Sequence, residues 1–378
     1  MKRLQQNRTI GDGKTRGGLG RMAAAACLAL LCAGALAQAP APALGAYQAD
    51  RTQTSVSGLS SGAYMAVQLQ VAYSKDIIGA GVIAGGPYYC AANNMAYASI
   101  CMGQVPFFPP NPAIMAGFAK DFARARKIDP LSHLADDRVY VFSGTQDTIQ
   151  RQPAVDATVS FLQQVGVKPQ NLKYVNNLPA GHAVIAPGQG NDCAANESPY
   201  ISHCETGDKG QERPYDQAGA LLQHIYGPLN APAGTPSGQI IAFDQRAYAA
   251  SSTSMADTGY LYVPRSCTEA GAGCKVHVAL HGCVQSAESV GNRFYTETGY
   301  NRWADSNRML VLYPQVNQSA LRPYNPKGCW DWWGYSGSHY AYKSAPQMKA
   351  IMQMVQRLTQ PGQVTTPKPN VQPGRTKF

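Results

Sequence analysis

The pentapeptide GLSSG at residues 58–62 constrains the fold of this chain more than any other segment. It stands between a short β-type segment, 53–57, and a helical segment, 63–73, with Ser60 at its centre. A serine in such a strand-to-helix turn has a strained backbone, and the flanking glycines let strand and helix approach without Cβ clashes. In a chain with 37 glycines the motif alone is weak. Its position between a strand and a helix makes Ser60 a candidate nucleophile.

Short apolar strands alternate with helical stretches along the rest of the chain. Runs such as VHVAL at 276–280 and MLVLY at 309–313 suit strands buried on both faces of a sheet. The pattern predicts an α/β fold, with a mostly parallel sheet in a single domain. The Pro/Gly-rich stretch 227–238 is typical of a linker, or of a long connection inside one domain. Further strands are expected at 79–84, 138–142, 172–175 and 259–263, and further helices at 155–165 and 345–358.

A nucleophilic serine needs a base, and the base needs an orienting carboxylate. In the α/β-hydrolase order the acid and then the histidine follow the serine, on loops after later strands. Asp147 lies in the loop after the strand expected at 138–142, and His182 lies in a loop after the strand expected at 172–175. We therefore expect Asp147 and His182 to act together with Ser60.

Other acids and histidines compete for these two roles. Asp147 could instead cap the following helix, and Asp137 and Asp156 could replace it as the acid. His203 and His224 are the alternatives to His182. His203 stands between two cysteines that are expected to be bridged, and His224 stands on a helical stretch, so both suit a mobile base less well.

The turn His281-Gly-Cys283 follows the strand expected at 276–280. In ordinary α/β hydrolases an HG-type turn after an early strand supplies an oxyanion amide, and it precedes the serine. Here it follows the histidine, which is the order expected if the N-terminal part of the fold had been moved to the C-terminal end of the chain. A separate second α/β domain would leave both halves with incomplete sheets. We therefore expect a circularly permuted α/β-hydrolase.

The first 37 residues carry half of the chain's net charge of +10. A basic segment, a roughly 15-residue apolar run and a closing Ala-Leu-Ala predict a secretory signal peptide at 1–37, cleaved after Ala37. The run is short for a transmembrane helix. A start at Met22, or a lipid anchor at Cys27 or Cys32, are the alternatives. The remaining charge is spread out, so we expect no nucleic-acid partner.

Export leaves eight cysteines, an even number that is typical of disulfides. Eight cysteines allow about 105 connectivities. No paired C-x-x-C or H-x-x-x-H spacing occurs, so we expect no metal site. The order along the chain suggests the pairs Cys90–Cys101, Cys193–Cys204, Cys267–Cys274 and Cys283–Cys329.

The combination of these segments resembles the extracellular-type short-chain polyhydroxyalkanoate depolymerases, a family with its lipase box near the N-terminus and a circularly permuted α/β-hydrolase fold. The resemblance spans about residues 47–358. The matching motifs are GLSSGAYM at 58–65, GTQD at 144–147, GH at 181–182, LHGC at 280–283 and CWDWWG at 329–334.

The resemblance implies roles for five residues. Ser60 would be the nucleophile, Asp147 and His182 would complete a triad, and the amides of Ser61 and Cys283 would form the oxyanion hole. The implied reaction is hydrolysis of poly(3-hydroxybutyrate) or its oligomers through an acyl-enzyme, with no cofactor.

Three of the four tryptophans of the chain lie in the segment CWDWWGY at 329–335. Aromatic faces suit a methyl-bearing aliphatic polyester, although clustered aromatics more often belong to a core. We expect at least one of them to line the site. The candidate substrate-binding residues are Trp330, Trp332, Trp333 and Tyr64.

The expected organisation is a signal peptide at 1–37, a catalytic domain at 38–360 and a disordered tail at 361–378. Depolymerases of this kind usually carry a C-terminal polymer-binding domain, and this tail is too short to fold as one. We expect a secreted or periplasmic monomer with no stable membrane anchor. The alternatives are a feruloyl or acetyl-xylan type of carbohydrate esterase, or a non-catalytic polymer-binding protein on the same scaffold.

Overall fold

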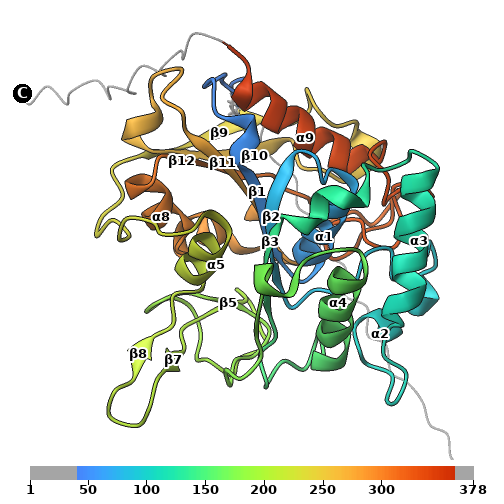
Figure 1. The fold of residues 1–378 in the computed structure, drawn as a ribbon. Helices are drawn as coiled ribbons and strands as arrows, with labels where there is room; N and C mark the ends of the chain where they lie inside the picture. The colour runs from blue at the N-terminus through green and yellow to red at the C-terminus, as the bar shows by residue number, and fades with distance from the viewer. Residues whose placement is uncertain (1–40, 362–378) are drawn as a thin grey trace, which may run out of the picture. The chain divides into compact units, whose positions relative to one another are not determined.

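An eight-stranded sheet runs through residues 41–361, the part of the chain that the computed structural model describes (Figure 1). The predicted signal peptide, and all but the first residue of the predicted tail, lie outside these residues. Neighbouring strands are parallel from one edge as far as β12, and the last two strands of the sheet are antiparallel. Across the sheet the order is β4 (Leu172–Val175), β3 (Arg138–Phe142), β2 (Ile77–Ile83), β1 (Thr54–Leu59), β11 (Lys275–Leu280), β12 (Met309–Tyr313), β10 (Thr258–Val263) and β9 (Gln239–Asp244).

The strand order confirms the circularly permuted fold. Strand β1, which leads into the GLSSG motif, is central, with the early strands on one side and the late strands on the other. A permutation requires the two ends of the described chain to lie close together. They do, because the amides of Tyr47 and Ala49 both donate to the carbonyl of Leu358, at 3.1 Å each.

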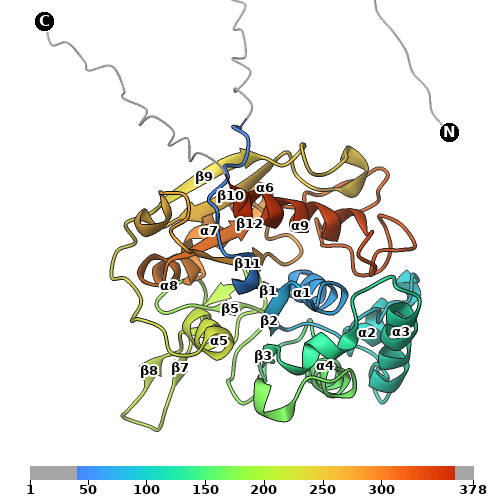
Figure 2. The ribbon, with the colours of Figure 1, turned by 45° about the horizontal axis from the view of Figure 1, so that its top comes forward.

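Helices cover both faces of the sheet (Figures 1 and 2). One apolar cluster packs α1 (Ser61–Ala72), α3 (Pro112–Arg124), α4 (Gln152–Gln164) and α9 (Pro346–Thr359) against one face. A second cluster packs α5 (Gln217–Tyr226), α7 (Arg293–Glu297) and α8 (Tyr300–Ser306) against the other. The parallel strands from β3 to β12 are therefore buried on both sides, as the continuous apolar runs predicted, whereas the edge strand β4 is only partly buried.

Smaller elements lie in the connections. These are the helices α2 (Ala98–Cys101) and α6 (Ala287–Val290), the pair β5 (Val184–Ile185) and β6 (Ile201–Ser202), and the protruding hairpin of β7 (Glu205–Thr206) and β8 (Arg213–Pro214). The stretch 227–238 connects α5 to β9. It is held to α8 and its C-cap by bonds from the Asn230 amide to Asn307 Oδ1, at 2.8 Å, and from the Ala233 amide to the Arg302 carbonyl, at 2.9 Å. It is thus a connection within the fold.

Element bounds differ from expectation by one to three residues, at the serine turn and elsewhere. Helix α1 begins at Ser61 rather than at residue 63, because the positive φ of Ser60 turns the chain directly from strand into helix. Strand β1 begins at Thr54, after a short 3₁₀ turn at Arg51–Gln53 that is capped by Asp50. The edge strand β9, in which only Phe243 is buried, was not predicted, because its residues show little alternation.

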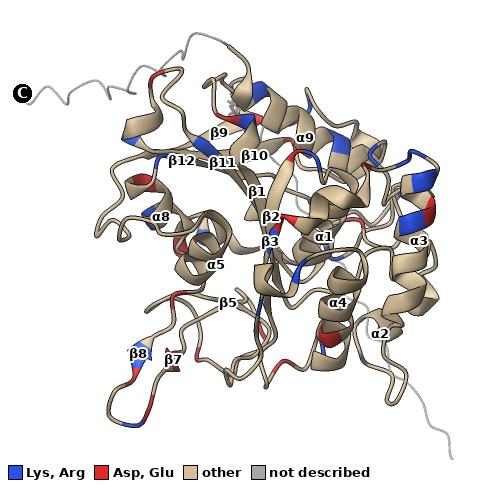
Figure 3. Cartoon of the chain, viewed as in Figure 1, with Lys and Arg blue, Asp and Glu red and all other residues tan. Residues whose placement is uncertain are grey.

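Four disulfides join cysteines that are neighbours along the chain: Cys90–Cys101, Cys193–Cys204, Cys267–Cys274 and Cys283–Cys329. Charged residues are scattered over the helices and loops, with acidic and basic residues interspersed (Figure 3). Within residues 41–361, no helix is both long and apolar enough to cross a membrane. The same residues contain no group of histidine, cysteine or acidic side chains arranged to hold a metal ion.

Candidate active site

Ser60 occupies a sharp turn between β1 and α1. Its φ of 57° and ψ of −121° are rare for a residue with a side chain, so the turn stores strain. Glycine is required on both sides of it. A Cβ on Gly58 would lie 2.3 Å from backbone atoms of Gly62, and a Cβ on Gly62 would lie 2.3 Å from the carbonyl oxygen of Leu280. The motif therefore brings strand, helix and the neighbouring strand β11 into close contact beneath Ser60.

His182 and Asp147 meet at the carboxyl ends of neighbouring strands. The loops after β3 and β4 are joined by bonds from the Thr145 amide to the Leu178 carbonyl and from the Gln146 amide to the Ala180 carbonyl, at 2.9 and 3.0 Å. This pairing brings Nδ1 of His182 to 2.7 Å from Oδ2 of Asp147, and both side chains are buried.

The carboxylate of Asp147 is further fixed by its own loop. Its other oxygen, Oδ1, accepts the amides of Ile149 and Gln150 at 2.8 Å each. With Oδ2 placed to accept from His182, the imidazole is held with its proton on Nδ1 and with Nε2 free to accept one. His182 and Ser60 line the same cavity, and no direct hydrogen bond joins them among the described residues.

Asn196 also holds these two loops together, and it was not anticipated from the sequence. Its Oδ1 accepts the amides of His182 and Thr148, at 3.0 and 2.9 Å, and its Nδ2 donates to the carbonyl of Gln146 at 3.0 Å. One side chain thus bonds to His182 itself and to both neighbours of Asp147. No local sequence signal marks such a bridge.

The rival acids and bases have other partners. Asp137 accepts from the Gln70 amide group at 3.0 Å, and Asp156 accepts from the Tyr174 hydroxyl at 2.6 Å. His203 contacts the exposed Asp192 at 3.8 Å, and His224 contacts the carbonyl of Asn171 at 2.8 Å. None of these four acids and histidines lines the cavity.

The backbone amides of Ser61 and Cys283, both beside Ser60, have no acceptor within residues 41–361. Ser61 is the first residue of α1, where helix amides lack intrahelical partners. Cys283 follows the strand β11 in the turn that contacts the serine motif. Both residues line the cavity, so both amides suit a negatively charged oxygen.

His281 anchors the turn that carries Cys283. It is fully buried, and burial lowers its pKa to about 4, against the opposing effect of its hydrogen bond to the Gly282 carbonyl. At neutral pH its Nδ1 donates to the Gly282 carbonyl at 2.6 Å, and its Nε2 accepts the Val316 amide at 3.1 Å. His281 is thus a neutral structural histidine.

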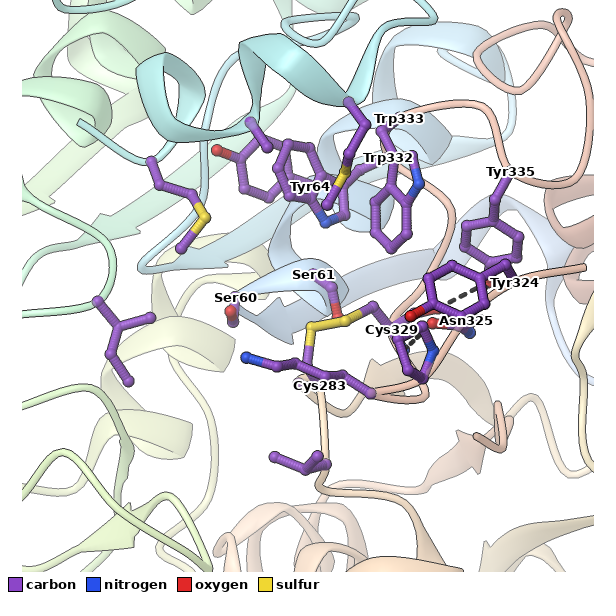
Figure 4. A pocket seen from close by; sticks show the side chains of 18 of the residues that line it. Ser60, Ser61, Tyr64, Cys283, Tyr324, Asn325, Cys329, Trp332, Trp333 and Tyr335 are labelled. Carbon is purple, nitrogen blue, oxygen red and sulfur yellow. Dashed lines mark hydrogen bonds between the residues drawn. A yellow bond between two sulfur atoms is a disulfide. The ribbon is translucent and has the colours of Figure 1, made fainter. Parts of the chain in front are cut away.

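The cavity has a volume of about 880 Å³ and one aromatic wall (Figure 4). Tyr64 stacks on Trp332 with ring centroids 4.5 Å apart, and Trp333 packs edge-on against Trp332 at 5.3 Å. All three line the cavity, opposite the disulfide between Cys283 and Cys329. The charged residues of the lining are Arg322 and Lys327, and no acidic residue belongs to it.

The structure places Trp330 away from the cavity, contrary to the expectation that it binds substrate. It is 0% exposed and does not line the cavity. Its indole packs 5.5 Å from the ring of His281, in the core behind the turn. The segment has no regular secondary structure, so the alternation of its side chains depends on contacts that the sequence does not encode locally.

The aromatic loop is organised by Asp331. Its carboxylate accepts the four consecutive amides of residues 333–336, at 2.6–3.2 Å, and the hydroxyl of Ser336 at 2.5 Å. Burial raises its pKa, and these hydrogen bonds oppose that shift. The amide of Asp331 in turn donates to Gln347 Oε1 at 2.9 Å. These contacts fix the backbone that presents Trp332 and Trp333.

No protein-family model matches the chain. Among curated proteins, it is 41% identical over 360 residues to a poly(3-hydroxybutyrate) depolymerase of Delftia acidovorans, which covers 94% of this chain and 69% of that protein. It is 40% identical over 347 residues to a polyhydroxybutyrate depolymerase of Talaromyces funiculosus, which covers 88% of this chain and 96% of that protein.

Two solved structures share the fold. One is a PHB depolymerase from Penicillium funiculosum, and the other is a PHB depolymerase complexed with an R3HB trimer. Each has a TM-score of 0.75 and 38% sequence identity, and each match covers 84% of this chain and 98% of the other. The chain therefore belongs to the poly(3-hydroxybutyrate) depolymerase family of carboxylic ester hydrolases.

Proposed function

We propose that this protein hydrolyses the ester bonds of poly(3-hydroxybutyrate) or its oligomers, with Ser60 as nucleophile, His182 as general base and Asp147 as the orienting acid. The observation that carries the proposal is the 2.7 Å contact between His182 Nδ1 and Asp147 Oδ2, on the cavity that Ser60 also lines. The names of the relatives supply the substrate class.

In the first half of the reaction, Ser60 Oγ attacks an ester carbonyl carbon while His182 Nε2 takes the serine proton. Asp147 stabilises the imidazolium that forms. The carbonyl oxygen becomes an oxyanion and accepts hydrogen bonds from the amides of Ser61 and Cys283. When the carbon–oxygen ester bond breaks, His182 gives its proton to the leaving alcohol, and the acyl group remains on Ser60.

In the second half, water replaces the alcohol. His182 takes a proton from the water as its oxygen attacks the acyl carbon, and the same two amides hold the second oxyanion. The bond to Ser60 Oγ then breaks, and His182 returns the proton to Oγ. The products are the free serine and a chain that ends in a carboxylic acid.

The surface around the cavity favours a polymeric or oligomeric substrate. Phe107 is 97% exposed, and Phe108, Leu321 and Tyr324 are also largely exposed. Phe107 and Phe108 belong to the segment 95–108, and other residues of this segment line the cavity. Leu321 and Tyr324 belong to the segment 321–324, and Tyr324 itself lines the cavity. Exposed apolar groups beside a cavity are typical of binding surfaces, and an aliphatic polyester is a suitable partner.

Export and domain organisation form part of the same proposal. The signal-peptide pattern at 1–37 and the four disulfides support a protein that matures outside the cytoplasm. We assign 38–360 to the catalytic domain and 361–378 to a tail. N-terminal sequencing of exported protein tests the cleavage site, and a first residue other than Gln38 would correct it.

The triad is tested with Ser60→Ala. The variant is expected to fold with the parent's melting temperature and to lose turnover of 3-hydroxybutyrate oligomers and of 4-nitrophenyl butyrate. Ser289→Ala, an exposed serine on α6 outside the cavity, is the matched control and retains activity. Activity retained by Ser60→Ala would remove the assignment of Ser60 as nucleophile.

The substrate class is tested by comparing kcat/KM on the 3-hydroxybutyrate trimer with kcat/KM on feruloyl and acetyl-xylan esters. We expect the trimer to be preferred. Preference for either carbohydrate ester would support the esterase alternative, and polymer binding without cleavage of any ester would support the non-catalytic alternative. A pre-steady-state burst of 4-nitrophenol tests the acyl-enzyme.

A further inference from the structure

Gln285 joins two segments of the candidate active site that are far apart in the sequence. Its side chain is 0% exposed. Its Oε1 accepts the Gly282 amide at 2.7 Å, and its Nε2 donates to the carbonyls of Pro199 and Tyr200 at 2.9 and 3.0 Å. The acceptor serves one segment and both donor hydrogens serve the other, so the side chain makes three of its four possible hydrogen bonds.

The two segments carry groups that line the same cavity as Ser60. Tyr200 packs edge-on against the ring of His182, with centroids 5.9 Å apart, and its carbonyl also accepts the amide of Val184. Gly282 immediately precedes Cys283, whose amide is a candidate oxyanion donor. Tyr200, Gly282 and Cys283 all line the cavity. Gln285 therefore sets the distance between Tyr200, which packs against the proposed base His182, and the turn that carries the Cys283 amide.

The other polar groups of the turn are also occupied. The Gly282 carbonyl accepts from His281, and the Val284 amide donates to the Lys327 carbonyl at 2.7 Å. Gln285 accepts from the Gly282 amide. Of the three amides of residues 282–284, that of Cys283 is therefore the one without an acceptor within the described chain. Loss of Gln285 would free the Gly282 amide and allow the turn to rotate.

We propose that Gln285 is a positioning residue that holds the Cys283 amide at the distance from His182 and Ser60 that the oxyanion requires. The inference rests on the proposed function. Its consequence is specific: loss of Gln285 weakens binding of the tetrahedral transition state and leaves binding of the ground-state ester largely intact. Removal of an entire oxyanion donor costs on the order of 10²–10³ in rate, and displacement of one costs less.

The test is Gln285→Met, which keeps the length of the side chain and removes its three hydrogen bonds. The matched control is Gln245→Met. Gln245 is equally buried, and it makes the same pattern of one accepted and two donated bonds, to the Gln315 amide and to the carbonyls of Ala256 and Gln315. Neither Gln245 nor these partners line the cavity.

Both full-chain variants are assayed on 4-nitrophenyl butyrate well below their melting temperatures, with active sites counted by a serine-reactive phosphonate. Gln285→Met is expected to lower kcat by about 10- to 100-fold at little change in KM. Gln245→Met is expected to lower the melting temperature comparably and to keep kcat close to the parent's. The affinity of Ser60→Ala,Gln285→Met for the 3-hydroxybutyrate trimer should equal that of Ser60→Ala.

Equal kcat losses in Gln285→Met and Gln245→Met, or a loss confined to KM, would overturn the inference. If Gln285→Met does not fold, Gln285→Glu serves the same test, because it keeps an acceptor for Gly282 and leaves at most one donor, the O–H of a protonated carboxyl. Parent-like kcat in that variant would also overturn the inference. Failure of the proposed function is seen separately, as activity that survives Ser60→Ala in the parent chain.

Discussion

The phenol ring of Tyr64 and the indole of Trp332 stack with their centroids 4.5 Å apart and their planes inclined by 20°. Tyr64 lies on α1, one helical turn after Ser60, and its hydroxyl donates to the carbonyl of Cys101 at 2.7 Å. Trp332 belongs to the loop that Cys329 ties to Cys283. The aromatic wall of the cavity is thus attached both to the helix that follows Ser60 and to the turn that carries Cys283.

Trp332→Ala should weaken recognition of oligoesters more than recognition of small esters. An aromatic face in contact with the chain is worth about 1–2 kcal/mol, so kcat/KM for the 3-hydroxybutyrate trimer should fall about 5- to 30-fold. The loss on 4-nitrophenyl acetate should be smaller, and Trp332→Phe should recover most of the trimer activity. Equal losses on both esters would mean that Trp332 acts through stability alone.

Asp147→Asn should lower kcat with little effect on KM or folding. Asparagine can still accept the amides of Ile149 and Gln150 through Oδ1. Its NH₂ group would then face His182 Nδ1 and favour the tautomer that carries the proton on Nε2, which cannot act as a base. In serine proteases the equivalent change costs about 10⁴-fold.

Asp156→Asn is the control for that measurement. Asp156 accepts from Tyr174 away from the cavity, so the parent kcat is expected. If the single-turnover acylation rate falls less in Asp147→Asn than in Asp156→Asn, another residue is the orienting acid.

The buried carboxyl of Asp137 should make stability depend on pH. Burial raises its pKa to about 7, with the Gln70 amide group opposing the shift and Asp136 adding to it. A raised carboxyl pKa means that the folded state binds more protons than the unfolded state between the two pKa values. The free energy of unfolding therefore falls as pH rises from about 4 to about 7.

Asp137→Asn removes this titration and keeps an acceptor for Gln70. Urea unfolding at several pH values should show a shallower decline in the variant across that window, with greater stability than the parent at neutral pH. Asp136→Asn is the comparison, because the hydrogen bond and charge of Lys168 lower the pKa of that exposed carboxyl. A parent-like slope in Asp137→Asn would contradict the assignment.

The cations Arg322 and Lys327 should favour substrates that end in a free carboxylate. Both line the cavity, neither forms an ion pair within residues 41–361, and the lining contains no acid. Because both side chains are exposed, the expected gain is modest. KM for the 3-hydroxybutyrate trimer acid should be about 2- to 5-fold below that for its methyl ester.

That difference should shrink in high salt and in Arg322→Met or Lys327→Met, because exposed charges are screened. Lys173→Met, an exposed residue of β4 outside the cavity, serves as the control. Identical KM values for the free and the capped trimer in the parent protein would rule out carboxylate recognition.

Local sequence determined the elements that carry the site. Strands β3, β4 and β12 have the bounds that their apolar runs predicted. The order of GLSSG, Asp147, His182 and the turn at His281 was sufficient to predict a permuted sheet, because each lies at the end of a strand or in the loop that follows one, and the carboxyl ends of parallel strands share one edge. Periodicity and turn residues are short-range properties, so one sequence suffices to read them.

Tertiary structure alone decided which side chains face the cavity and which hold it in shape. Trp330 enters the core while Trp332 and Trp333 face the cavity, because the carboxylate of Asp331 and the Cys329 disulfide fix an irregular loop. The bridges made by Asn196 and Gln285 join segments up to 86 residues apart through amide side chains that follow no local pattern. Such contacts exist only once the chain has folded, because their free energy depends on burial and on partners that the fold supplies.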